Sequence, residues 1–148
     1  MSTNSSYQDK YSLGYHLHLA FIAVVETLNQ ELRRAGLKIT HPQFTILQTV
    51  FRRPGLSQAE LARETAKDVA SITRSLAYLE KLGLVERKWL NGCTKGVFAT
   101  PQAESLRPLL DEAIRKTIDR ACAGLEEEEA GNLIRLLREI KTTLSRNE

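Results

Sequence analysis

One stretch of this chain, Leu56 to Val85, constrains its fold more than any other; it reads LSQAELARETAKDVASITRSLAYLEKLGLV. Ser57 followed three positions later by Glu60 forms a capping box, in which each side chain bonds a backbone N–H left unpaired at the start of a helix. A short helix is therefore predicted to begin at Gln58.

A second helix in the same stretch is delimited by Asp68, a favourable N-cap, and by Gly83, which suits the left-handed position after a helix. It is predicted to run from Val69 to Leu82. One side of this helix is apolar and is predicted to be buried; it consists of Val69, Ile72, Leu76 and Leu79. Two short helices with a tight connection predict a helix-turn-helix.

The opposite side of the second helix centres on Arg74. Around it on the exposed side lie Lys67, Ala70, Ser71, Tyr78 and Lys81, while Thr73 and Ser75 flank the core. Such a face suits a helix that enters the major groove of DNA and meets base edges and phosphates. The alternative is an ordinary solvated helix face.

A β-hairpin is predicted after the second helix, because Asn91-Gly92 separates two runs that favour strands, 84–90 and 93–99. Asn-Gly in this setting favours a two-residue type I′ turn. That register places Lys88 opposite Lys95, a pairing that costs stability unless an anion such as a DNA phosphate neutralises it. Trp89 would project from the other face as a packing residue at the base of the wing. Helix-turn-helix plus hairpin makes a winged helix.

Four segments now carry a family resemblance: THPQFTIL (40–47), LSQAELA (56–62), DVASITRSLAYLEKLGLVER (68–87) and VFAT (97–100). Together they resemble the MarR family of bacterial transcription regulators. The resemblance implies a homodimeric winged-helix repressor or activator whose second helix reads the major groove and whose wing reaches the minor groove. It also implies control by a small ligand or by oxidation. The candidate DNA contacts then also include Ser57, Gln58 and Arg87.

The predicted wing departs from the family pattern. The family usually carries Asp-x-Arg at the wing tip, whereas Asn91, Gly92 and Cys93 stand there in a hairpin that is shorter. This puts minor-groove contact in doubt, although Lys88 and Lys95 could still hold phosphates, which add affinity without reading sequence.

The helices outside the winged helix are predicted to form a dimerisation region. A long helix from Tyr11 to Ala35 is apolar nearly all round between Leu17 and Val25, so it needs cover on more than one side, from a partner chain or as a buried central helix. After the hairpin, a helix is predicted from about 101 to 123, with a kink at Pro108. A final helix is predicted to begin at the acidic cluster 126–129. It carries an apolar stripe that consists of Leu133, Leu137, Ile140 and Leu144. The predicted architecture is mainly α, with dimerisation regions 1–36 and 101–148 flanking a DNA-binding domain at 37–100.

A helix starting with the capping box Thr40 and Gln43 is predicted to support the DNA-binding helices. A small apolar or aromatic effector could bind between this helix and the dimerisation region, near His16 and His41, although ordinary surface or core histidines are the alternative. Cys93 is the candidate for redox control, because Lys95 beside it could lower its pKa.

Charge and motif content restrict the remaining functions. Nine basic and five acidic residues give 52–95 a charge of +4, whereas eight basic and ten acidic residues give 101–148 a charge of −2, so positive charge gathers on the predicted DNA-binding part.

No catalytic, metal-binding or nucleotide-binding motif occurs, so we expect no enzyme, metal or cofactor. The polar N-terminus and the lack of a long apolar run predict a cytoplasmic protein without membrane contact. A winged helix that binds proteins and never DNA is the competing hypothesis.

Overall fold

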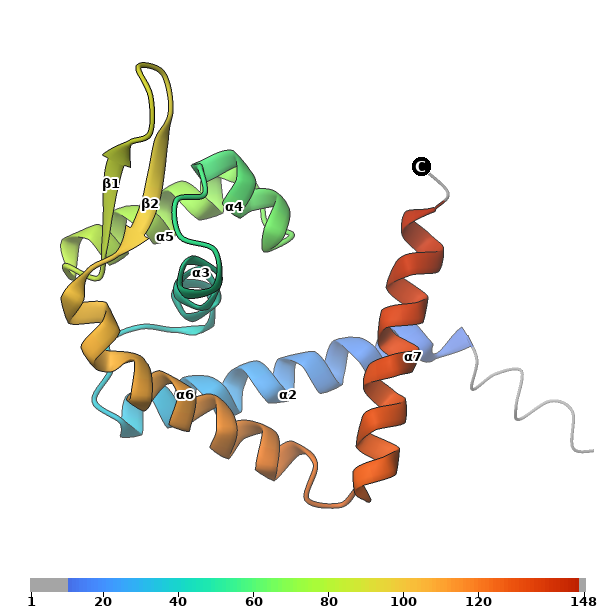
Figure 1. The fold of residues 1–148 in the computed structure, drawn as a ribbon. Helices are drawn as coiled ribbons and strands as arrows, with labels where there is room; N and C mark the ends of the chain where they lie inside the picture. Colours follow the sequence, from blue (N-terminus) through green and yellow to red (C-terminus); the bar gives the residue numbers. More distant parts are fainter. Residues whose placement is uncertain (1–10, 147–148) are drawn as a thin grey trace, which may run out of the picture.

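The computed structural model describes residues 11–146 and is mainly helical, with one two-stranded antiparallel sheet (Figure 1). Its elements in chain order are α2 (Leu13–Arg34), α3 (His41–Arg52), α4 (Gln58–Glu64), α5 (Val69–Lys81), β1 (Val85–Trp89), β2 (Lys95–Ala99), α6 (Pro101–Ala121) and α7 (Glu127–Ser145). Helices α3 to α5 and the hairpin lie together, above the crossing pair α2 and α6, while α7 stands to one side. The predicted winged helix with flanking helices is confirmed.

A hydrophobic core joins α3, α4, α5 and the base of the hairpin. Its fully buried side chains include Leu47, Leu61, Ile72, Leu76, Leu79 and Val97. The prediction of a buried stripe on α5 is confirmed for all but Val69, which is 57% exposed. Val69 is the first residue of α5, and the core covers the helix only from Ile72 onwards.

The predicted helix boundaries follow local hydrogen bonds. Ser57 N–H donates to Glu60 Oε2 (2.7 Å), and Asp68 Oδ1 accepts from the backbone N–H of Ser71 (2.8 Å). Gly83 has a φ of +72°, the left-handed conformation that ends α5 and turns the chain into β1. Both helices of the helix-turn-helix therefore begin where the sequence predicted.

The hairpin turn is not the predicted type I′ turn. Just beyond the ends of β1 and β2, Leu90 N–H donates to Thr94 O (2.9 Å), and this bond encloses three residues, Asn91, Gly92 and Cys93, none of which has a positive φ. Instead, Asn91 Oδ1 accepts from the backbone N–H groups of Cys93 and Thr94 (2.9 Å each). The asparagine side chain thus closes the turn and adds one residue to it, which shifts the register of the strands by one.

The shifted register places Lys88 opposite Gly96 and Trp89 opposite Lys95, so the predicted pairing of Lys88 with Lys95 is wrong. The prediction that Trp89 packs at the wing base is also wrong, since Trp89 is 64% exposed. Gly96 lies against Gly55, whose N–H donates to Val97 O (2.9 Å). The turn before α4 thereby adds a third short segment beside the hairpin.

The second half of α2 packs against the middle and second half of α6, where Leu28, Leu32 and Leu110 are buried. The buried Glu31 pairs with Arg34 (2.6 Å) and with Arg120 of α6 (3.4 Å). By contrast, the first half of α2 and all of α7 contain no buried residue. Among the described helices, none is long and apolar enough to span a membrane.

Candidate nucleic-acid interface

The start of α5 presents a hydrogen-bonded group around Ser71. The Ser71 hydroxyl donates to Asp68 Oδ2 (2.7 Å) and accepts from Arg74 Nη2 (3.2 Å). These bonds from the Ser71 hydroxyl and N–H, together with the charge of Arg74, hold the pKa of Asp68 below its usual value. The carboxylate therefore stays ionised and fixes Ser71 and Arg74 on one turn of the helix.

Arg74 is exposed on the side of α5 opposite the core. Its bond to Ser71 is the single hydrogen bond it makes within residues 11–146. The carboxylate of Glu64 pairs with Arg53 and not with Arg74. The remaining guanidinium donors are therefore available to a ligand outside the chain.

A polar depression of about 290 Å³ lies between the start of α3 and α5. It is lined by Pro42, Gln43, Lys67, Ser71, Arg74 and Ser75. Two of these residues are positively charged and none is acidic, so the depression suits an anionic group such as a phosphate oxygen. Ser75 contributes to its floor, because it is only 7% exposed. Ser75 is therefore the least accessible of the candidate DNA contacts.

A side-chain network ties α4, α5 and β1 together beside this face. Gln58 donates through Nε2 to Thr73 Oγ1 and accepts through Oε1 from Arg87 Nη1 (3.2 Å). Arg87 in turn pairs with Glu80. Three residues predicted separately as DNA contacts, Gln58, Thr73 and Arg87, are thus bonded to one another.

Of the other candidate DNA contacts on α4 and α5, some side chains are already hydrogen-bonded within the protein and others are exposed without such a role. Ser57 is occupied as the cap of α4, and its bonds with Glu60 lower the pKa of that carboxyl group. Tyr78, 38% exposed, donates its hydroxyl to the backbone oxygen of Lys38 (2.6 Å). Ala70 and Val69 are exposed at the start of α5. Val69, which the sequence analysis assigned to the core, offers an apolar surface of the kind that contacts thymine methyl groups.

The wing carries two lysines with different partners. Lys88 Nζ lies 2.8 Å from Glu86 Oε1, whereas Lys95 Nζ lies 4.7 Å above the ring of Trp89. The charge of Lys88 is therefore neutralised within the strand, and that of Lys95 is not. Cys93 is exposed in the turn. Sequence reasoning missed Trp89 as part of this surface, because the predicted register placed it on the packed face.

The two histidines proposed for an effector site have different environments, one exposed and one half-buried. His16 is exposed and contacts the ring of Tyr15 (5.6 Å between centroids). His41 is half-buried at the start of α3, edge-on to Phe21 of α2 (5.6 Å). Burial, and to a lesser degree the charge of Lys67, lowers the pKa of His41 below its ordinary value. No hydrogen bond or ring contact described in residues 11–146 joins the two histidines.

Comparison with known proteins shows what the DNA-binding part of this chain is similar to. The sequence model of the MarR family matches residues 35–88, which include α3, α4 and α5. The uncharacterized helix-turn-helix-type transcriptional regulator YybA of Bacillus subtilis is 25% identical to this chain over 113 residues, which is 75% of each protein.

Solved structures share the whole architecture. A MarR transcriptional regulator from Methanosarcina mazei has a TM-score of 0.82 at 16% identity, covering 92% of this chain and 91% of its own, and so shows the common fold. A MarR family protein from Mycobacterium tuberculosis, solved in complex with DNA, is 26% identical, with a TM-score of 0.71 over 86% of this chain and 96% of its own. The same protein in complex with salicylic acid has a TM-score of 0.70 over 86% of this chain and 95% of its own.

Proposed function

Because this chain belongs to the MarR family of DNA-binding transcription regulators, which are not enzymes, we propose that it is a homodimeric repressor of a pseudo-palindromic operator, released by a small ligand. In this proposal residues 37–100 bind DNA, while residues 1–36 and 101–148 form the dimer.

The observation that carries the DNA-binding proposal is the environment of Arg74. It is exposed, it points away from the buried Ile72, Leu76 and Leu79, and it makes one hydrogen bond, to Ser71, among the described residues. An arginine in this state can bond guanine O6 and N7 through two donors, which is the commonest sequence-specific contact in the major groove. Lys67 and Lys95 would add phosphate contacts that do not depend on sequence.

Unpartnered apolar helix faces support the homodimer. Leu13, Phe21 and Ile22 of α2 are 45%, 58% and 38% exposed, and Leu133 and Leu137 of α7 are 48% and 38% exposed. Monomeric soluble proteins rarely expose large apolar patches. A second copy that covers both helices would bury them in one interface, which we expect to exceed the ~2,000 Å² typical of obligate dimers.

A two-fold dimer determines how the operator would be arranged. The two copies of α5 would enter successive major grooves on one side of the duplex, about 34 Å apart. The operator should then be an imperfect palindrome.

Two arguments support ligand control: a relative binds a small molecule, and the DNA-binding residues 37–100 adjoin the proposed dimer-forming helices. The Mycobacterium tuberculosis protein was solved both with DNA and with salicylic acid. A small apolar or aromatic effector that changes the angle between α5 and the dimer-forming helices would change the spacing of the two α5 copies. This would weaken binding to an operator of fixed half-site spacing.

The decisive experiment compares Arg74→Ala with wild type on a duplex selected by the protein from random sequence and on a scrambled duplex. Arg74→Ala should lose roughly 1 to 3 kcal/mol of discrimination between them, because base contact is lost while phosphate contacts remain. Arg135→Ala in α7 removes the same charge far from α5 and should change neither affinity. Equal losses on both duplexes would show that Arg74 positions the helix without reading bases.

A further inference from the structure

The side chain of Trp89 lies at the end of β1, next to the hairpin tip, which projects beyond α4 and α5 (Figure 1). Trp89 is 64% exposed, so it adds little to the hydrophobic core. It is also the single tryptophan of the sequence. An indole in this state offers a large apolar surface to another molecule.

Strand pairing shows which way the Trp89 side of the hairpin points. Trp89 pairs with Lys95. The next pair on the same face of the sheet, two residues away on each strand, joins Arg87 and Val97. Val97 is buried in the core, and Arg87 bonds Gln58 of α4. Trp89 and Lys95 therefore extend, past the edge of the core, the face of the hairpin that is turned toward the DNA-binding helices.

The charges on the hairpin favour an anionic partner at this face. Lys95 Nζ lies 4.7 Å from the centroid of the Trp89 ring, a cation–π contact, and no carboxylate of residues 11–146 pairs with it. The one acid of the hairpin, Glu86, pairs with Lys88 (2.8 Å). That pair lies on the opposite face, where Lys88 Nζ is 5.5 Å from the ring of Phe98. The face of Trp89 thus combines an apolar ring with an ammonium group that no acid neutralises.

A DNA backbone offers the complementary surface, because a deoxyribose ring, its less polar part, stands beside each phosphate. We propose that Trp89 and Lys95 form a backbone clamp, in which the indole packs against a deoxyribose and the ammonium group bonds the neighbouring phosphate. The wing then holds the backbone and does not read the minor groove. Residues 91–94 at the hairpin tip include no arginine or lysine to enter that groove, and the Asn91 amide oxygen is already bonded within the turn. The clamp rests on the proposed function, since it is a further contact to the same DNA.

Tryptophan fluorescence of the full-length protein reports on the clamp directly, because Trp89 is its one source. Acrylamide is the quencher, since it is uncharged and is not repelled by phosphates. A saturating amount of the selected duplex should reduce the quenching severalfold. The control exchanges two side chains, Trp89→Leu with Leu90→Trp, which moves the indole to the opposite face of the strand. Its quenching should not change with duplex, and equal protection of both indoles would overturn the clamp.

Affinity distinguishes an apolar backbone contact from base reading. Trp89→Ala should weaken binding to the selected and the scrambled duplex alike, by roughly tenfold per half-site, which corresponds to about 60 Å² of buried apolar surface. The slope of log affinity against log salt should stay the same, because no charge is lost. Trp89→Phe should recover most of the affinity. Urea unfolding of Trp89→Ala should match that of the wild type, since the exposed indole lies outside the core.

Inosine tests whether the wing reads the minor groove. Replacing guanine by inosine in the selected duplex removes the amino group in the minor groove and leaves O6 and N7 in the major groove. The loss caused by Trp89→Ala should be equal on both duplexes, and a smaller loss on the inosine duplex would show minor-groove reading instead of a backbone clamp.

Two outcomes separate the clamp from the proposed function. A wild-type protein that binds the selected duplex while Trp89 stays open to acrylamide would overturn the clamp alone and would leave the indole as a surface for a protein partner. A protein that binds no duplex would contradict the proposed function, and the clamp with it.

Discussion

Arg87 on β1 donates a hydrogen bond of 3.2 Å to Oε1 of Gln58 on α4. Gln58 also donates to Thr73, and Arg87 also pairs with Glu80, so one chain of side chains links both helices of the helix-turn-helix to the wing. Residues joined in such a network have coupled effects on stability and binding. We therefore expect Gln58 and Arg87 to position the wing relative to α5.

A double-mutant cycle tests this link. Gln58→Ala and Arg87→Ala should each weaken DNA binding, and together they should cost less than the sum, with a coupling of roughly 0.5 to 1.5 kcal/mol, the usual contribution of one hydrogen bond. Affinities of the four proteins for the selected duplex give the coupling. Gln58→Ala combined with Arg53→Ala is the control, because Arg53 pairs with Glu64 and not with Gln58. Additive losses for Gln58 and Arg87 would contradict a positioning role.

The two wing lysines should differ in their salt dependence. Lys95→Ala should weaken binding to selected and scrambled duplexes alike and reduce the slope of log affinity against log salt by about one unit per half-site, because one phosphate contact is lost. Lys88→Ala should reduce the slope less, since Glu86 already neutralises Lys88 at 2.8 Å. Titrations at four salt concentrations measure both slopes. A larger effect for Lys88 would show that the ion pair opens on DNA.

The base of the hairpin depends on a close approach of two glycines. A Cβ added at Gly96 would lie 2.6 Å from the backbone oxygen of Gly55, so Gly96→Ala forces β2 away from the turn before α4. We predict a loss of roughly 1 to 3 kcal/mol in unfolding free energy, as for other overpacked positions. Urea unfolding at fixed protein concentration measures it. Gly92→Ala is the matched control, because a Cβ there meets no atom within 4 Å, and a similar loss for both variants would refute the steric explanation.

His41 should make stability depend on pH. Its pKa in the folded protein is lowered by burial and by Lys67, below the ordinary 6.5, so the unfolded chain binds the proton more readily. The unfolding free energy should therefore be unaffected by this group above about pH 6.5 and should fall as pH drops through 6.5 towards the lower folded value. Urea unfolding at about pH 7.5 and about pH 5.5 should show a smaller pH-dependent loss for His41→Gln than for wild type. The exposed His18 provides the control His18→Gln, and an equal loss in wild type and His41→Gln would exclude His41 as the cause.

The helix boundaries of this protein were predictable because each depends on residues three or four positions apart. Ser57 with Glu60 and Asp68 with Ser71 complete their hydrogen bonds within one helical turn. The buried side of α5 follows from helical periodicity alone, which is why Ile72, Leu76 and Leu79 were assigned correctly. These local features, with the family resemblance, also led to the helix-turn-helix and to DNA as its ligand.

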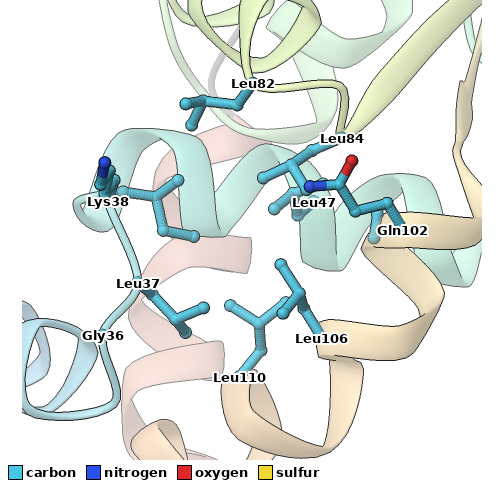
Figure 2. Close-up of a pocket in the computed structure, with 11 residues that line it drawn as sticks. Gly36, Leu37, Lys38, Leu47, Leu82, Leu84, Gln102, Leu106 and Leu110 are labelled. Atoms are coloured by element: carbon cyan, nitrogen blue, oxygen red, sulfur yellow. The ribbon is translucent and has the colours of Figure 1, made fainter.

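The tertiary structure alone decided how the elements meet. The hairpin register is an exception, because it follows from a local contact: the Asn91 side chain bonds the backbone N–H groups two and three residues ahead, and this alternative to the type I′ turn moved Lys95 from Lys88 to Trp89. The bond between Gln58 and Arg87 joins residues 29 positions apart. A cavity of about 190 Å³ beside Gln102 likewise exists only where four chain segments converge (Figure 2). Contacts of this kind depend on distances between elements, which periodicity and capping patterns in a single sequence do not specify.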